Sequence, residues 1–355
     1  MTQATHTVSP AALTDDLALR FATDLVAWQK KHGRSTLPWQ NTRDPYRVWL
    51  SEIMLQQTQV RTVLEYYARF LQRFPDVRAL AAAQLDEVLG LWSGLGYYSR
   101  ARNLHRCAQQ VVSEHGGEFP ASALTLQTLP GIGRSTAAAV ASFCFSERVA
   151  ILDGNVKRVL TRVLGYGQDL AASKNERALW TLAQELLPEQ AADMPRYTQA
   201  LMDLGATVCL PRKVQCGVCP VSDLCQANKQ GEPLAYPVKT RKLKRSSAIL
   251  WLLWAVNTQG QVWLQKRPDK GIWAGLFSLP VFDSEGDLLA AWVAGQDPQY
   301  IKPWKHVLTH RDLHLHPVQM TGESQYSPHC EGQWVDAGAW PDMGLPAPIR
   351  VLLAG

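Results

Sequence analysis

The spacing of apolar residues changes character about two thirds of the way along the chain. From Asp15 to Ala227, apolar residues recur at helical spacing, and glycine or proline interrupts the pattern at short intervals. No fixed repeat length joins these segments, which argues against a solenoid. The pattern predicts an all-α region of many short helices. The expected helices are 17–31, 48–74, 85–90, 100–114, 135–143, 155–164 and 175–187.

Beyond residue 240 the apolar runs become short and strand-like, with turns between them. Between the two regions, PVKTRKLKRSS carries five Lys or Arg residues and no acid, which is typical of a phosphate-attracting linker. We therefore expect an all-α domain over 15–236, a basic linker over 237–247 and a mixed α/β domain over 248–355. The expected strands are 248–257, 262–266, 276–281 and 314–320.

Composition limits the class of protein. A chain of 355 residues can hold two or three domains, and 46% hydrophobic with 19% charged residues indicates a globular protein. The net charge of +5 suits a polyanionic partner. The first residues lack a basic segment followed by an apolar core, and no apolar run reaches membrane-spanning length. We expect a cytoplasmic protein with no membrane partner.

The segment from Leu129 to Leu160 contains a Gly-x-Gly turn that precedes a helix. Gly131 and Gly133 permit positive φ angles, and the amides that begin the next helix point outward, where a DNA phosphate could bind. A plain helix connection is the alternative explanation of the two glycines. An isolated carboxylate, Asp153, follows in a loop. A phosphate site followed by a carboxylate indicates an enzyme that acts on nucleic acid.

A second carboxylate, Glu52, lies in the predicted helix 48–74. Gln56 and Gln59 follow it at i+4 and i+7, which predicts a polar stripe suited to the edge of a base. An ordinary surface glutamate is the alternative for Glu52. For Asp153, the alternative is a helix N-cap.

Four of the seven cysteines fall within seventeen residues, in the pattern C-x6-C-x2-C-x5-C. Such a group can hold zinc or a [4Fe–4S] cluster. The single C-x2-C pair and the basic residues nearby favour the cluster, in a structural and DNA-positioning role. These cysteines are Cys209, Cys216, Cys219 and Cys225. The scattered Cys107, Cys144 and Cys330 are expected to be small buried residues or idle thiols.

Several ordered segments, LPWQ, WLSEIMLQQTQV, LWSGLGYYSRARNLH, LPGIGRSTA, ILDGNVKRV and MDLGA, together with the cysteines, carry a family resemblance. The chain resembles the helix-hairpin-helix DNA glycosylases, and in particular the adenine DNA glycosylase family (MutY type), over nearly its whole length. The resemblance implies a [4Fe–4S] cluster. It also implies that Glu52 is the general acid/base, that Asp153 stabilises the sugar cation, and that Gln57 and Tyr97 wedge into the base stack.

The chemistry of adenine release agrees with two such acids. Adenine leaves poorly until N7 is protonated, so a carboxylic acid with a raised pKa must lie against the flipped base. The oxocarbenium-like sugar then needs a second carboxylate, as in glycosidases. We expect Asn155 and Ser135 to supply supporting hydrogen bonds. The remaining expected DNA contacts are Gln56, Gly131, Gly133, Arg134, Lys157, Thr309 and His310.

Ser135 separates this chain from its lyase relatives. In bifunctional enzymes of the endonuclease III type, a lysine at this hairpin position forms a Schiff base. Serine here predicts a monofunctional glycosylase, although Lys157 could form an adventitious imine. The resemblance implies that the substrate is double-stranded DNA with an A:8-oxoguanine or A:G mispair, and we expect a monomer. Two alternatives stay open: a bifunctional glycosylase/lyase, and a non-catalytic iron–sulfur DNA-binding or redox-sensing protein.

The resemblance implies that the C-terminal region, 248–355, has a Nudix-like fold and recognises 8-oxoguanine opposite the adenine. No acid cluster follows Gly271, so we expect no pyrophosphatase activity. Thr309 and His310 stand where relatives often carry an F-S-H triplet, but Leu308 replaces the aromatic residue. The neighbouring histidines are expected to be neutral hydrogen-bonding groups rather than a metal site. These are His306, His310, His314 and His316.

Overall fold

The computed structural model describes residues 14–240, 244–291, 297–322 and 332–355. Cys330 lies outside these ranges. The chain forms two compact units, Met1–Gln56 with Gln110–Lys242, and Gln57–Gln109 with Leu243–Gly355. Each unit thus combines segments that are distant in the sequence. The boundaries 15–236, 237–247 and 248–355 stay predictions.

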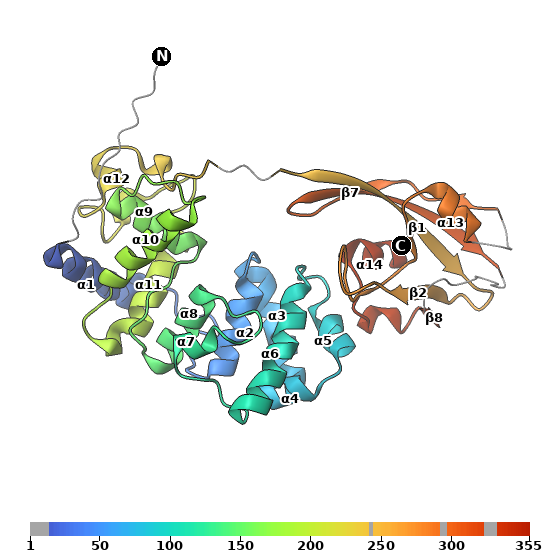
Figure 1. The fold of residues 1–355 in the computed structure, drawn as a ribbon, viewed down its shortest axis with the longest axis horizontal. Helices are drawn as coiled ribbons and strands as arrows, with labels where there is room; N and C mark the ends of the chain where they lie inside the picture. Colours follow the sequence, from blue (N-terminus) through green and yellow to red (C-terminus); the bar gives the residue numbers. More distant parts are fainter. Residues whose placement is uncertain (1–13, 241–243, 292–296, 323–331) are drawn as a thin grey trace, which may run out of the picture. The chain divides into compact units, whose positions relative to one another are not determined.

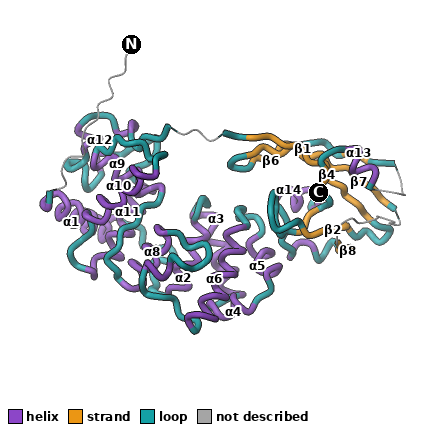
Figure 2. Tube along the Cα trace, in the orientation of Figure 1, coloured by secondary structure: helices purple, strands orange, loops and turns teal. Residues whose placement is uncertain are grey.

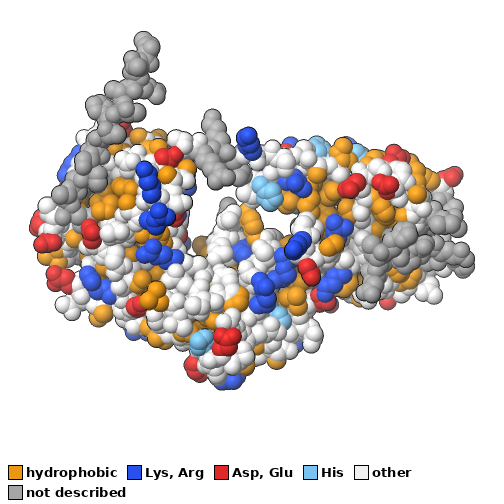
Figure 3. All heavy atoms as spheres, viewed as in Figure 1, with side chains coloured by type: hydrophobic (Ala, Val, Ile, Leu, Met, Phe, Trp, Pro, Cys, Tyr) orange, Lys and Arg blue, Asp and Glu red, His pale blue; other side chains and the backbone are white. Residues whose placement is uncertain are grey.

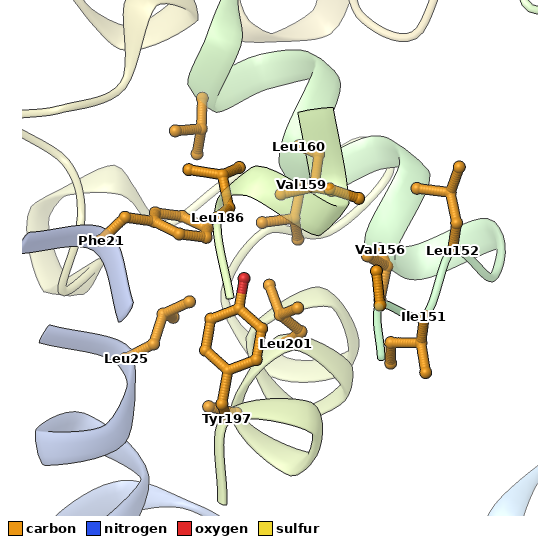
Figure 4. Packing of buried hydrophobic residues seen from close by; sticks show 14 of the residues in the cluster. Phe21, Leu25, Ile151, Leu152, Val156, Val159, Leu160, Leu186, Tyr197 and Leu201 are labelled. Atoms are coloured by element: carbon orange, nitrogen blue, oxygen red, sulfur yellow. The ribbon is translucent and has the colours of Figure 1, made fainter. Parts of the chain in front are cut away.

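The first unit is helical, and one of its apolar clusters packs between α1, α9, α10 and α11 (Figure 1). Helices α1 and α9 both pack against α11. In the core, the rings of Phe21 and Tyr197 meet edge to face at 6.3 Å, and Leu25 and Leu201 lie beside them (Figure 4). The helices are α1 Asp15–His32, α2 Pro45–Leu55, α7 Ala123–Leu126, α8 Arg134–Phe145, α9 Gly154–Leu164, α10 Ser173–Glu185, α11 Met194–Thr207 and α12 Gln226–Lys229, with 3-10 turns Ala191–Asp193, Cys216–Val218 and Pro233–Ala235.

Local sequence explains where several of these helices begin and end. The Thr14 hydroxyl accepts from Leu17 N at 3.3 Å and caps α1. Asp44 caps α2, with Pro45 in the first turn, where its missing N–H is harmless. Gly165 ends α9 with a φ of 62°, in the left-handed region that glycine adopts without strain.

The second unit joins helices to a mixed sheet, whose strands are orange in Figure 2. The path through the sheet is β3-β2-β1-β7-β5, with β4 paired to β1, β6 to β7 and β8 to β2. The elements are α3 Val60–Arg73, α4 Val77–Ala82, α5 Leu85–Trp92, α6 Ser99–His115 (which continues into the first unit), β1 Ser246–Val256, β2 Val262–Lys266, β3 Phe277–Ser278, β4 Val281–Phe282, α13 Glu285–Ala290, β5 Gln299–Tyr300, β6 Trp304–Val307, β7 Arg311–Thr321, β8 Gly332–Val335, the 3-10 turn Trp340–Asp342 and α14 Ala347–Leu353.

Strands β1 and β7 run parallel along their whole length, and from Leu250 of β1 onward side chains on both faces are buried. Leu250 and Leu252 of β1 belong to one apolar cluster, whereas Leu253 and Ala255 belong to another. Alternate side chains of a strand point to opposite faces, so this long apolar run supplies two cores. The mixed sheet confirms the predicted fold class of the C-terminal region.

Within the second unit, α5 and the segment before α14 are in close contact. The Ser93 hydroxyl donates to Leu345 O at 2.8 Å, and the Tyr98 hydroxyl donates to the same carbonyl at 3.0 Å. A Cβ on Gly90 would lie 2.2 Å from Asp342 O, so only glycine permits this approach. These contacts join the helices of the second unit to its C-terminal part.

One expected helix is wrong. The predicted helix 48–74 is interrupted, because α2 ends at Leu55, α3 begins at Val60, and Gln57 between them has a φ of 58°. Helix α11 and strand β6 were not expected. Strand β1 begins at Ser246, shortly before its expected start at residue 248. Among the helices of the described residues, none is long and apolar enough to cross a membrane.

Candidate active site

Asp153 lies immediately before α9 and caps it. Its Oδ1 accepts a hydrogen bond from Val156 N at 2.7 Å, so Asp153 is the N-cap of α9, as the alternative interpretation of the sequence expected. Burial raises the pKa of this carboxyl, while hydrogen bonds from the backbone N–H groups of Val156 and Asn155 and the charges of Arg158 and Lys157 oppose the shift. Capping the helix does not exclude a functional role for Asp153, because the partial positive charge of a helix N-terminus stabilises a carboxylate that lies there.

Glu52 lies on α2, between the buried residues Ser51 and Ile53. Burial, and secondly the charge of Asp153, raise the pKa of Glu52 to about 8. The side chain keeps some exposed surface, but protein atoms enclose its carboxyl group. The shift has the direction that the sequence predicts for a general acid, and the negative charge of Asp153 contributes to it. Glu52 can therefore hold a proton near neutral pH.

The start of α8 contacts the segments that carry both acids. Gln56, four residues after Glu52, donates from Nε2 to Thr136 Oγ1 at 3.4 Å. Ser135 Oγ accepts from Leu152 N at 3.3 Å. Because α2 ends at Leu55, Gln56 and Gln59 lie outside that helix, and the predicted helical stripe is wrong. Gln56 reaches the site from a loop instead.

The two hairpin glycines have different roles. Gly131 has a φ of 77°, as expected, whereas Gly133 has a φ of −82° and caps α8. A Cβ on Gly133 would meet nothing within 4 Å, so the space before this helix is open. The exposed Arg134 guanidinium stacks 3.9 Å above the Trp180 ring, which orients it beside the hairpin.

Asn155 and Lys157 both have protein partners. Asn155 Oδ1 accepts from Arg158 Nη2 at 2.8 Å. A Cβ on Gly205 of α11 would lie 2.7 Å from the Cβ of Asn155, so glycine permits this close approach. Lys157 Nζ pairs with Glu176 Oε1 at 2.6 Å, which means that a DNA phosphate would compete with a carboxylate for this amine.

Sequence reasoning missed Arg158, which organises the same region. Its guanidinium donates to Asn155, to Gly205 O at 2.6 Å and to Cys209 O at 2.8 Å. The side chain is buried. Arg158 thus connects α9, the helix that begins after Asp153, with α11 and with Cys209, the first cysteine of the cluster. Its position three residues after Asn155, one helical turn away, was the available signal.

In the second unit the structure brings together Gln57, Tyr97 and Thr309. The Tyr97 hydroxyl donates to Gln57 Oε1 at 2.7 Å and makes a short contact with the Thr309 hydroxyl. Gln57 and Tyr97 both have positive φ angles, 58° and 48°, which are unusual for residues other than glycine. His310 follows Thr309 and is exposed.

Arg100, which the sequence did not single out, supports both loops of this group. Its Nη2 donates to Thr58 Oγ1 at 3.1 Å, to Leu95 O at 3.3 Å and to Gly96 O at 3.2 Å. Burial lowers the pKa of its guanidinium to about 10. A buried arginine that bonds both loops fixes the positions of Gln57 and Tyr97.

All four cysteines of the predicted cluster line one small cavity, whose volume is about 30 Å³. Arg162 Nη1 donates to Cys209 Sγ at 3.2 Å. In the ranges that the structure describes, no three His, Cys, Asp or Glu side chains are grouped as they would be around one metal ion. A [4Fe–4S] cluster instead binds each thiolate to a different iron. Four sulfur donors on one cavity fit such a group by their chemistry. The cysteines are Cys209, Cys216, Cys219 and Cys225.

The histidines of the C-terminal region have separate surroundings. His316 stacks on Trp251 with ring centroids 4.7 Å apart. Burial lowers the pKa of His306, which favours a neutral ring. No metal-binding group includes them among the described residues. The hydrogen-bonding role that the sequence favours stays a prediction.

Comparison with known families agrees with this arrangement. Residues 50–185 match the HhH-GPD superfamily of base excision DNA repair proteins, and residues 251–355 match the NUDIX domain. A thermostable thymine-DNA glycosylase has a similar structure, with a TM-score of 0.54 and 28% identity over 61% of this chain and 98% of that one. An endonuclease III–DNA complex shares the fold, with a TM-score of 0.51 at 20% identity, over 62% of this chain and 98% of that one. The chain thus combines a helix-hairpin-helix base excision repair domain with a Nudix domain.

The relatives narrow this class. The adenine DNA glycosylase of Buchnera aphidicola subsp. Baizongia pistaciae is 36% identical over 344 residues, covering 94% of this chain and 96% of that protein. The Mus musculus adenine DNA glycosylase is 47% identical over 232 residues, which are 62% of this chain and 44% of that protein. The chain belongs to the adenine DNA glycosylase family. This confirms the family resemblance and the predicted fold class.

Proposed function

We propose that this protein is a monofunctional adenine DNA glycosylase of base excision repair. It flips adenine out of a duplex in which adenine is mispaired with 8-oxoguanine or guanine, and it hydrolyses the N-glycosidic bond. The observation that carries the proposal is the pair of partly buried carboxyl groups, Glu52 with a pKa of about 8, raised in part by the charge of Asp153, and Asp153 at a helix N-terminus. Family membership supplies the substrate base.

Glu52 begins the reaction as an acid. With a pKa of about 8 it is protonated near neutral pH and can give its proton to N7 of the flipped adenine. Protonation turns the base into a better leaving group, and the C1′–N9 bond then breaks. The resulting carboxylate of Glu52 can accept a proton from the attacking water.

Asp153 stabilises the sugar cation. As the base departs, positive charge develops at C1′ and the ring oxygen, and a fixed carboxylate lowers the energy of this state. The hydrogen bond that Val156 N donates to Asp153 Oδ1 at the start of α9 holds the carboxylate in place before the reaction. Asn155 and Ser135 support it indirectly, because each contacts the segment on one side of Asp153.

The absence of strand cleavage follows from the chemistry of position 135. A serine hydroxyl cannot form a Schiff base with C1′, whereas a lysine amine can. Lys157, the other amine near Asp153 in the sequence, is held by Glu176 at 2.6 Å. We therefore propose base removal without efficient β-elimination, which disfavours the bifunctional alternative.

The remaining contacts serve DNA binding. Gly131, Gly133 and Arg134 form the phosphate site of the hairpin, and Lys157 adds charge beside it. Figure 3 shows a row of Lys and Arg side chains on the first unit, near α9 and α10, as expected for a surface that meets a polyanion. In the second unit, Gln57 and Tyr97 wedge into the stack, while Thr309 and His310 read the opposite base.

The four cysteines would hold a [4Fe–4S] cluster. When bound, the cluster supplies a structural link between the loop 209–225 and the helices around it. Arg162 would donate a hydrogen bond to the Cys209 sulfur, and Arg158 binds the carbonyl of the same residue. We propose further that the protein acts as a monomer in the cytoplasm.

A gel assay tests the proposal. Purified protein is incubated with an 8-oxoguanine:A duplex, and strand breaks are measured with and without later treatment with alkali. We expect breaks only after alkali, and none with Glu52→Gln. Breaks without alkali would support the bifunctional alternative. Unchanged base release by Glu52→Gln would refute the role of Glu52, and DNA binding without any base release by the wild-type protein would support the non-catalytic alternative.

A further inference from the structure

The hairpin between β6 and β7 ends in Thr309 and His310, which we call the recognition turn. Leu308 N donates to Arg311 O at 2.8 Å and closes it. Two-residue turns usually contain glycine or asparagine with positive φ angles. Thr309 and His310 are neither of these, and neither has a positive φ. Local sequence therefore does not favour this turn, and contacts from outside it must hold it.

Arg245 supplies these contacts from the residue before β1. Its Nη2 donates to Leu308 O at 2.9 Å, and its Nη1 donates to Thr309 O at 3.1 Å. The same guanidinium pairs with the carboxylate of Asp312, on the other arm of the hairpin. Adjacent to it, Ser246 N donates to His310 O at 3.1 Å. The planar guanidinium fork thus spans the turn from one arm to the other.

The hydrogen bonds to the backbone distinguish Arg245 from its basic neighbour Lys305. Lys305 Nζ lies 3.7 Å from Asp312 and shares only the charge interaction. The hydrogen bond from Arg245 is the main reason that the pKa of Asp312 lies below its ordinary value, so the pair stays charged at neutral pH. The Arg245 side chain is 43% exposed, so its substitution leaves the apolar cores intact.

We propose that Arg245 is a positioning residue that fixes the recognition turn so that the Thr309 hydroxyl meets the Tyr97 hydroxyl, and that it thereby sets the preference for 8-oxoguanine over guanine opposite the adenine. This inference rests on the proposed function. Arg245 acts through Thr309. A lysine cannot replace it, because one ammonium group cannot reproduce the planar fork that binds both carbonyls and the carboxylate.

The experiment compares three variants of the full-length protein: Arg245→Ala, Arg245→Lys and the charge control Lys305→Ala. Single-turnover base release is measured on 8-oxoguanine:A and G:A duplexes at two salt concentrations. Amide hydrogen exchange is followed at Leu308 and Arg311. We expect both Arg245 variants to lower the ratio of the two rates by about 5- to 30-fold, as the loss of one or two hydrogen bonds implies. Exchange at the turn should accelerate.

Lys305→Ala should keep both the rate ratio and the exchange rates, and weaken binding to the two duplexes equally, as loss of a phosphate-attracting charge does. If Arg245→Ala behaves like Lys305→Ala, Arg245 is only a DNA charge and the inference is wrong. A wild-type preference for 8-oxoguanine that survives Arg245→Ala likewise overturns it. Equal wild-type rates on the two duplexes overturn instead the proposed specificity on which it rests.

Discussion

Ser135 Oγ accepts a hydrogen bond from Leu152 N at 3.3 Å, which connects the first turn of α8 to the residue before Asp153. Helix α8 follows the glycine hairpin, so one serine links the proposed phosphate site to the proposed cation stabiliser. The side chain is an acceptor in this contact, which agrees with a positioning role.

Replacing this serine by an amine should change the chemistry. Ser135→Lys is expected to form an imine with C1′ that borohydride traps, and to cleave some of the strand without alkali. The control Ser135→Ala should slow base release by about 2- to 10-fold, in keeping with one lost hydrogen bond, and give no trapped complex. Absence of trapping by Ser135→Lys would argue that the position does not face C1′.

Glu52→Gln should separate activity from stability. Base release is expected to fall by a factor on the order of 10² to 10⁴, because the amide cannot donate a proton to N7. Yet the free energy of unfolding at pH 7 should rise by roughly 1–3 kcal/mol, because the native protein no longer encloses an acid that must stay protonated.

The sign of that stability change follows from the raised pKa. The folded protein binds the Glu52 proton more tightly than the unfolded chain, so this contribution is fully present below pH 4.5 and is lost as pH rises toward about 8. Wild type and Glu52→Gln should therefore have equal stability below pH 4.5 and diverge above it. Denaturant unfolding at several pH values measures this. A constant difference across that range would contradict the raised pKa.

The same pKa predicts the pH dependence of the reaction. Single-turnover base release should decline above about pH 8, where Glu52 loses its proton, with a tenfold loss per pH unit well above that value. Rates are measured on one duplex at fixed ionic strength, with DNA binding followed in parallel. A flat profile through pH 9 would exclude Glu52 as the acid.

Arg100 offers a test of the loops that carry Gln57 and Tyr97. Arg100→Ala should lower the free energy of unfolding by about 2–4 kcal/mol, because it removes several hydrogen bonds to buried or partly buried acceptors. The matched control is Arg106→Ala on the same helix, whose guanidinium is exposed and binds Asn103 at 2.5 Å; it should change stability by less than about 0.5 kcal/mol. Similar losses in both variants would contradict the supporting role of Arg100.

Gly205→Ala tests the contact between α11 and the first turn of α9, next to Asp153. The new methyl group would lie 2.7 Å from the Cβ of Asn155, and the resulting shift should cost about 1–3 kcal/mol of stability. It should also slow base release, because Asn155 follows Asp153 closely. Gly167→Ala is the control, since a Cβ there meets nothing within 4 Å. Thermal unfolding and single-turnover rates measure both; a harmless Gly205→Ala would show that α11 can move freely.

Local sequence sufficed for some of these features and not for others. The cap at Asp153 and the glycine hairpin follow from short motifs, as does the cysteine spacing. The break between α2 and α3 could not be predicted, because Gln56 to Gln59 contain no glycine or proline. The positive φ of Gln57 depends on Tyr97 and on Arg100, which lie some forty residues away.

Long-range contacts explain the other omissions. Strand β6 exists by pairing with β7, in the register Trp304↔Leu315 to Val307↔Asp312, and its own four residues are too short a run to show the alternation of a strand. The role of Arg245 depends on carbonyls more than sixty residues later. By contrast, the long apolar run of β1 was visible because both faces of the strand are buried from Leu250 onward.

The contact of α5 with the segment before α14 has a practical consequence. A chain cut in the basic linker loses the C-terminal sheet, but it also bares the surface around Gly90, Ser93 and Tyr98 that Asp342 and Leu345 cover. Weak mismatch recognition by such a fragment would then have two causes: the loss of the C-terminal residues proposed to read the opposite base, and the exposure to solvent of a surface on the remaining helices that Asp342 and Leu345 normally cover. Substitutions within the full chain distinguish the two sources, whereas deletions confound them.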